Sequence, residues 1–187
     1  MSESLTSWAS SRLERLCGEF ASRSVGAPGN RAATTWLADE LGRLGYEIET
    51  PEFDAVDWTG GEALLDIGSE RLVLQPSFFS LGTAVAGELE VITTVDELRE
   101  KELSGRIVLI RGELAKEPFM PKNFAFYNPP EHQEVIALLE EKTPAALLTA
   151  TGRNEGLAGG NDGFPLFEDI DFDIPSACMQ AELGLSL

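Results

Sequence analysis

One histidine, His132, limits the chemistry that this chain of 187 residues could perform. A Ser-His-Asp triad would have to use it, but the sequence holds no G-x-S-x-G nucleophile elbow. Zinc sites of the HExxH type need two histidines. His132, Gln133 and Glu134 form the H-x-E of zinc deaminases, but the required PCxxC partner is missing. We therefore expect His132 to be a solvated residue in the first turn of a helix. The sequence predicts no catalytic residue and no metal-binding residue in this chain.

Four acidic side chains near the C-terminus supply oxygen atoms at closely spaced positions. These residues are Glu168, Asp169, Asp171 and Asp173. Calcium prefers such oxygen ligands, but the segment has neither the ligand order nor the closing Glu of an EF-hand. We interpret it as a solvated acidic loop and a weak candidate for cation binding.

The two cysteines, Cys17 and Cys178, lie far apart and form no CxxC motif. This spacing indicates neither a zinc knuckle nor a redox pair. Because a free cysteine usually behaves as a small apolar residue, we expect two reduced thiols in the core.

A segment rich in aromatic residues, 117–130, is the strongest candidate for a contact surface. It carries Phe119, Met120, Phe124, Phe126 and Tyr127. Aromatic residues and methionine are enriched where proteins touch partners. The alternative is that these side chains fold back into a small core beneath the loop, because large apolar groups are more often buried.

The charge of the chain excludes several classes of partner. Its 32 acidic residues against 14 basic ones give a net charge of −18 at pH 7. Nucleic-acid binding needs clustered Lys and Arg, and anionic membrane surfaces would repel the chain. The N-terminus shows no secretory signal and no apolar run reaches the length of a membrane span, so we expect a cytoplasmic protein.

The first 55 residues predict helix, loop, helix and strand. Apolar residues at helical spacing mark residues 4–20, and Gly, Pro and Ser mark the loop 22–30. Asn30 is a candidate cap for a helix over 31–44 that Gly45 closes. Alternating polar and apolar residues over 46–53 predict a strand.

Residue 56 onward predicts a β-rich domain with a few helices. Short apolar runs indicate strands at 63–67, 72–74, 87–93, 106–111 and 145–150, with a last extended piece from Ile174. Thr94 and Glu97 form a capping box for a short helix that ends near Leu103, and a second helix covers 131–142. This order favours an α+β fold in which helices cover a sheet.

The order of these pieces resembles a known family, the co-catalytic zinc aminopeptidases, whose clan includes glutamate carboxypeptidase and the transferrin receptor. The opening R-x-x-G-x-x-G loop matches at Arg23, Gly26 and Gly29, and GY-x-[VI] matches at 45–48. The segments 87–91, 103–112, 143–148 and 173–177 are similar to the protease-associated (PA) domain that many of these enzymes insert after their first strand. The resemblance implies a leading segment, 1–55, of a peptidase-type α/β domain and a PA-like domain, 56–187.

The resemblance carries over no metal ligand and no catalytic carboxylate. The His-x-Asp motif that begins the zinc site in this family is absent. Zinc and a peptide substrate therefore belong only to the full-length family, and we expect this chain to be a truncated, non-catalytic front part that shapes substrate access or mediates protein contacts. The alternative is a stand-alone PA-type module that binds a protein or a small ligand.

Two pieces of the leading segment lack an obvious partner. The apolar stripe on helix 31–44, which includes Trp36, needs a surface to cover it. A strand over 46–53 needs neighbours along its edges. The sequence therefore predicts self-association, or contact with a missing peptidase body, through this helix face and this strand.

Overall fold

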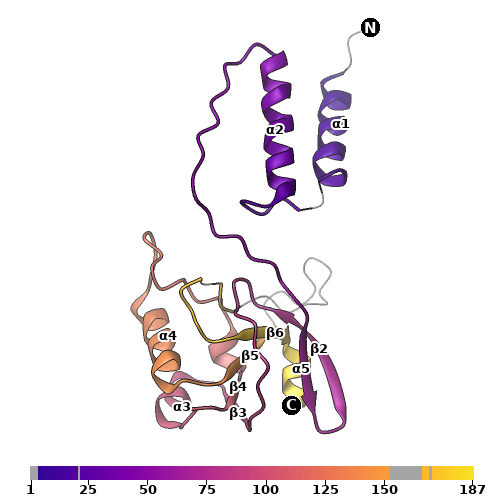
Figure 1. Ribbon diagram of the computed structural model, residues 1–187. Helices are drawn as coiled ribbons and strands as arrows, with labels where there is room; N and C mark the ends of the chain where they lie inside the picture. Colours follow the sequence, from indigo (N-terminus) through magenta and orange to yellow (C-terminus); the bar gives the residue numbers. More distant parts are fainter. Residues whose placement is uncertain (1–3, 21, 152–165, 169) are drawn as a thin grey trace. The chain divides into compact units, whose positions relative to one another are not determined.

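The computed structural model describes residues 4–20, 22–151, 166–168 and 170–187. The chain forms two compact units, Met1–Thr59 and Gly60–Leu187, which are described separately here (Figure 1). The first unit contains two helices, and the second contains a six-stranded mixed sheet with helices. The predicted α+β fold class is confirmed.

In the first unit, α1 (Leu5–Gly18) and α2 (Pro28–Arg43) stand where the sequence predicts helices. The expected cap at Asn30 is wrong, because α2 begins at Pro28, three residues earlier than predicted, with Ala27 as its N-cap. Pro28 explains the earlier start, since its fixed φ suits the first helical position and its missing N–H costs nothing there. Asn30 lies inside the helix and donates to the Arg23 carbonyl at 3.2 Å.

The end of α2 follows the prediction. Gly45 has a φ of +89°, a conformation that glycine adopts without strain. The N–H of Gly45 donates to Gly42 O at 3.0 Å, and that of Tyr46 donates to Leu41 O at 3.2 Å. This pair of hydrogen bonds is a Schellman motif, which satisfies carbonyls that the helix end would leave unpaired.

The predicted strand over 46–53 is wrong. Residues 46–62 have no regular secondary structure, although many of them are extended in the figure (Figure 1). A strand is stabilised by hydrogen bonds to a neighbouring strand, and no described strand pairs with this segment. Alternation of side chains is therefore not sufficient to form a strand here.

The expectation of a buried Cys17 is also wrong, because Cys17 is exposed on α1 while Cys178 is buried. The reason is that α1 has no buried residue at all. In α2 only Ala33 is buried. The two helices of this unit thus share almost no core of their own.

The sheet of the second unit has the order β1-β2-β6-β5-β4-β3. A hairpin of β1 (Ala63–Ile67) and β2 (Glu70–Pro76) pairs antiparallel with β6 (Ser176–Gln180). The remaining strands run parallel to β6: β5 (Ala146–Thr151), β4 (Ile107–Ile110) and β3 (Leu89–Ile92). Each lies at a position where the sequence predicts a strand or an extended piece.

The parallel strands are apolar on both faces because both faces are covered. Val108 and Ile110 of β4 belong to one buried cluster and Leu109 between them to another, as the alternation along a strand requires. The first cluster also holds side chains of α3 (Val95–Glu100) and α4 (Pro130–Lys142). The second is covered by α5 (Ala181–Ser186), a helix that the sequence patterns did not predict.

The capping box at α3 differs in one bond from the prediction. Thr94 Oγ1 accepts from the Glu97 N–H at 3.2 Å, as expected. The Glu97 carboxylate, however, accepts from the N–H and the hydroxyl of Thr93, at 2.6 and 2.9 Å. These two bonds favour the ionised form and hold the pKa of Glu97 below its usual value. The helix ends at Glu100, earlier than the predicted Leu103.

Candidate functional site

The aromatic segment 117–130 begins inside the core. Phe119 is buried, and its ring stacks on Phe167 with centroids 5.4 Å apart and planes inclined by 21°. Its N–H donates to Leu166 O at 2.9 Å, which ties the segment to a distant part of the chain. Phe119 is therefore a packing residue, and Met120 beside it is half-buried.

His132 is half-buried in the first turn of α4 rather than fully solvated. Its Nδ1 accepts a hydrogen bond from the Met120 N–H at 3.0 Å. The Phe119 ring meets the imidazole edge-on, with centroids 5.2 Å apart. Through this hydrogen bond and this ring contact, His132 anchors the aromatic segment to α4.

The tip of the same segment is exposed. Phe124, Phe126 and Tyr127 are 44%, 91% and 62% exposed. Two interactions hold the residues on either side of this tip against α4. Lys122 Nζ lies 2.7 Å from a carboxylate oxygen of Glu140, and Gln133 Nε2 donates to Asn128 O at 2.9 Å. The segment thus presents apolar rings on an anchored base, as a contact surface requires. We call Phe124, Phe126 and Tyr127 the aromatic tip.

The acidic candidates do not form a metal centre within the part of the chain that the structure describes. Glu168, Asp171 and Asp173 are exposed, and Asp169 lies outside the described residues. Asp171 accepts from Asn123 Nδ2 at 2.7 Å, so one carboxylate bonds to the aromatic segment. Among the described residues, no three His, Cys, Asp or Glu side chains lie close enough to share a metal ion.

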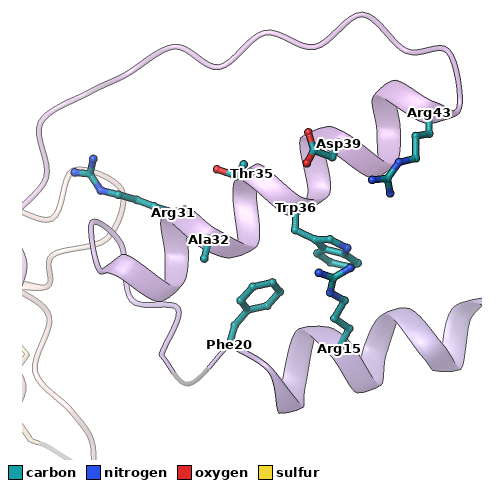
Figure 2. Close-up of a pocket in the computed structure, with 8 residues that line it drawn as sticks. All are labelled: Arg15, Phe20, Arg31, Ala32, Thr35, Trp36, Asp39 and Arg43. Atoms are coloured by element: carbon teal, nitrogen blue, oxygen red, sulfur yellow. The ribbon is translucent and has the colours of Figure 1, made fainter.

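The first unit contains a recess of about 400 Å³ between α1 and α2. Figure 2 shows Trp36, Phe20 and Arg15 between the two helices, with Arg31 near the start of α2 and Arg43 near its end. The Phe20 and Trp36 rings lie 5.9 Å apart, and the Arg15 guanidinium lies 5.3 Å from the Trp36 centroid. The sequence reasoning missed this recess. A usable signal was the presence of several arginines within the first 43 residues of an acidic chain.

A second hollow, of about 390 Å³, lies in the sheet unit beside the ends of β4 and β5. Small residues, Ala115, Ala150 and Ala181, leave the space, and Arg111 and Lys116 supply positive charge. Arg111 is held in place by a bond from Nη1 to Gly184 O at 2.7 Å. The hollow has the size of a small-molecule site and lies outside the carboxyl ends of parallel strands, where ligands often bind.

Comparisons with known proteins give one protein of similar sequence and one solved structure of similar fold. No family model matches the sequence. The chain is 24% identical over 175 residues to the "Probable lipoprotein aminopeptidase LpqL" of Mycobacterium tuberculosis (strain ATCC 25618 / H37Rv), covering 88% of this chain and 31% of that protein. The solved structure "Aminopeptidase from Aneurinibacillus sp. strain AM-1" superposes with a TM-score of 0.62 at 18% identity, covering 94% of this chain and 38% of that one.

Both of these proteins are named as aminopeptidases. The chain is similar in sequence to part of the first and shares the fold of part of the second. It spans about a third of the length of each. The part of the chain that the structure describes contains no helix that is long and apolar enough to cross a membrane.

Proposed function

We propose that this chain is the non-catalytic leading and PA-like portion of a zinc-dependent aminopeptidase-like protein. In this role the first unit contacts another polypeptide, and the aromatic tip shapes substrate access or binds a protein. The observation that carries the proposal is the similarity to about a third of two aminopeptidases, together with an exposed aromatic tip on an anchored base.

The chain's own residues do not suit the zinc that the family resemblance implies. Structural and catalytic zinc sites take three or four His, Cys, Asp or Glu ligands. The sequence has a single histidine, and the described residues bring no three such side chains together. Zinc ligands would have to come from another part of the protein or from another polypeptide.

The proposed contact through the first unit rests on exposed apolar side chains. Leu37 and Leu44 of the α2 region and Phe53 of the following segment are all exposed. An isolated pair of helices is stabilised mainly by burying such a face. A second polypeptide, either another copy or a peptidase body, would cover it.

An activity assay tests whether this chain has peptidase activity by itself. The chain is incubated with aminoacyl anilides and added zinc, and released aniline is measured against a buffer blank. We expect no turnover above the blank, because metal-activated water needs ligands that the described residues do not bring together. Turnover that a chelator abolishes would contradict the proposal.

A dye-binding assay tests the aromatic tip. An apolar dye should bind the chain, and replacing Phe126 and Tyr127 by Ser should lower the signal by at least half. The matched control is Val73→Ser, which removes an equally exposed apolar side chain from β2. An equal fall in both variants would show that the tip is not a distinct contact surface.

The alternative proposal, a small-ligand module, is favoured by one observation, the hollow beside Arg111 and Lys116. A carboxylic acid with a short aliphatic chain fits its apolar lining and its two cations. Isobutyrate is a simple probe. Stabilisation of the chain by isobutyrate that Arg111→Gln abolishes would support this alternative.

A further inference from the structure

The indole N–H of Trp36 lacks an acceptor. Trp36 Nε1 is buried yet has no hydrogen-bond partner among the residues that the structure describes. A buried donor without a partner destabilises the fold, because its hydrogen bond to water is lost and not replaced. The indole lies between the two helices and lines the recess, but Nε1 itself is covered, so a ligand oxygen reaches it only when a side chain over the indole, such as that of Arg15, turns aside (Figure 2).

Positive charge lies next to this indole. The Arg15 guanidinium lies over the Trp36 ring, and Arg15 pairs at 2.9 Å with Glu19 through a half-exposed bridge. Exposed bridges of this kind are weak, so Arg15 is free to turn towards a ligand. At the other end, Glu40 is shared between Arg43 and Arg12. One carboxylate cannot neutralise two guanidinium groups, so positive charge is left at the recess.

Arg31 adds a third cation to the lining, and Asp39 is the one acidic residue there. Arg31 Nε donates to the Gly26 carbonyl at 3.4 Å, and among the described residues no carboxylate forms an ion pair with it. The recess is thus a basic site in a chain of net charge −18. Its complement is an anion with oxygen acceptors, and a carboxylate can bond to a guanidinium and an indole N–H together.

We propose that the recess between α1 and α2 binds an acidic side chain of a partner polypeptide, its carboxylate accepting from Trp36 Nε1 beside the guanidinium of Arg15. The proposal rests on the proposed function in one respect, that the first unit contacts another polypeptide. A polypeptide is favoured over a free acid because α1 buries no residue and α2 buries only Ala33. A partner that brings apolar residues next to the acidic one would complete this missing core, with its apolar part on the Phe20 and Trp36 rings.

The fluorescence of Trp36 can report whether a ligand occupies the recess. In a variant with Trp8→Phe and Trp58→Phe, Trp36 is the only tryptophan and its emission follows events at the recess. The titrant is a blocked peptide in which Glu and Leu alternate, and the control titrant has Gln in place of Glu. We expect a saturable change with the Glu peptide and at least tenfold weaker binding of the Gln peptide, because charge-assisted bonds are about twice as strong as neutral ones.

Substitutions locate the site. Arg15→Gln should weaken binding of the Glu peptide by about tenfold, since Arg15 lies beside the proposed carboxylate. Arg31→Gln should weaken it less, because Arg31 lies at the far end of the recess from Trp36 (Figure 2). Asp39→Asn should tighten binding about twofold, since it removes a repelling charge. The matched control is Arg71→Gln, which removes the same charge from the β1–β2 hairpin of the other unit. Trp36→Phe, followed by the anisotropy of a labelled Glu peptide, tests the indole N–H separately and should also weaken binding.

Three results would overturn the proposal. Equal binding of the Glu and Gln peptides would exclude a carboxylate, and equal losses in Arg15→Gln and Arg71→Gln would exclude the recess. Self-association of the peptide-free chain that Arg15→Gln abolishes would place a second copy in the recess instead of a separate partner. Peptidase turnover by the chain alone would refute the proposed function, but it would leave the peptide titration and its outcome unaffected.

Discussion

Gly184 of α5 lies where a side chain has no room. A Cβ built at this position would lie 2.1 Å from the Cβ of Ala150 in β5, and 3.7 Å from Met179 Sδ. Carbon atoms in contact stay about 3.5–4.0 Å apart. Gly184→Ala must therefore move α5 and β5 apart by more than 1 Å, because the Ala150 Cβ is fixed to the backbone and cannot turn aside.

The expected cost follows from two opposing effects. Forcing an extra methyl group into a packed core costs about 1–3 kcal/mol. Alanine favours a helix over glycine by up to about 1 kcal/mol, which offsets part of this cost. We expect a net loss of about 1–2 kcal/mol, or a fall in melting temperature of roughly 4 °C for each kcal/mol.

The assay is thermal and urea unfolding followed by circular dichroism, with two further variants. Gly42→Ala in α2 is the matched control, since a Cβ there meets nothing within 4 Å. It should stabilise its unit by about 0.5–1 kcal/mol. Ala150→Gly in the Gly184→Ala background removes the opposing methyl group and should recover part of the loss. A Gly184→Ala protein as stable as the wild type, or no coupling between positions 150 and 184, would refute the reasoning.

Three further predictions test other contacts. The lowered pKa of Glu97 means that its stabilising effect is present above its unfolded pKa and is lost as pH falls through the folded value, so Glu97→Gln should flatten the loss of stability in acid, as measured by urea unfolding between pH 7 and pH 3. His132→Phe keeps a ring but removes the acceptor of the Met120 N–H, so hydrogen exchange should speed up at Met120 by at least tenfold and stay unchanged in β4. Gly29→Ala would place a Cβ 1.9 Å from Ser22 O and should destabilise the first unit by about 1–3 kcal/mol, whereas Gly18→Ala, with open space, should not.

The sequence patterns located most of the elements. Short β-branched and apolar runs such as 107–110 became strands, since they fit a sheet that is covered on both faces. The Schellman motif at Gly45 and the capping bond at Thr94 formed where local chemistry predicted them, because a turn or a cap depends on a few neighbouring residues. The α+β class followed from the order of these local signals.

Local patterns failed where a distant partner decides the outcome. The alternation over 46–53 is that of a strand, yet a strand needs a neighbour to receive its hydrogen bonds, and none of the described strands pairs with it. The short helix α5 carries no strong signal of its own, and its packing over Leu148 and Ala150 stabilises it.

For the candidate sites too, the sequence determined some features and the tertiary structure determined others. The sequence by itself determined which chemical groups are present: one histidine, an excess of carboxylates and a run of aromatic residues over 117–130. It could not determine which aromatic residue is buried, and only the tertiary structure placed Phe119 against Phe167 while leaving Phe126 exposed. It also brought Arg15 of one helix over Trp36 of another. Burial and proximity depend on residues far apart in the chain, and no local pattern records them.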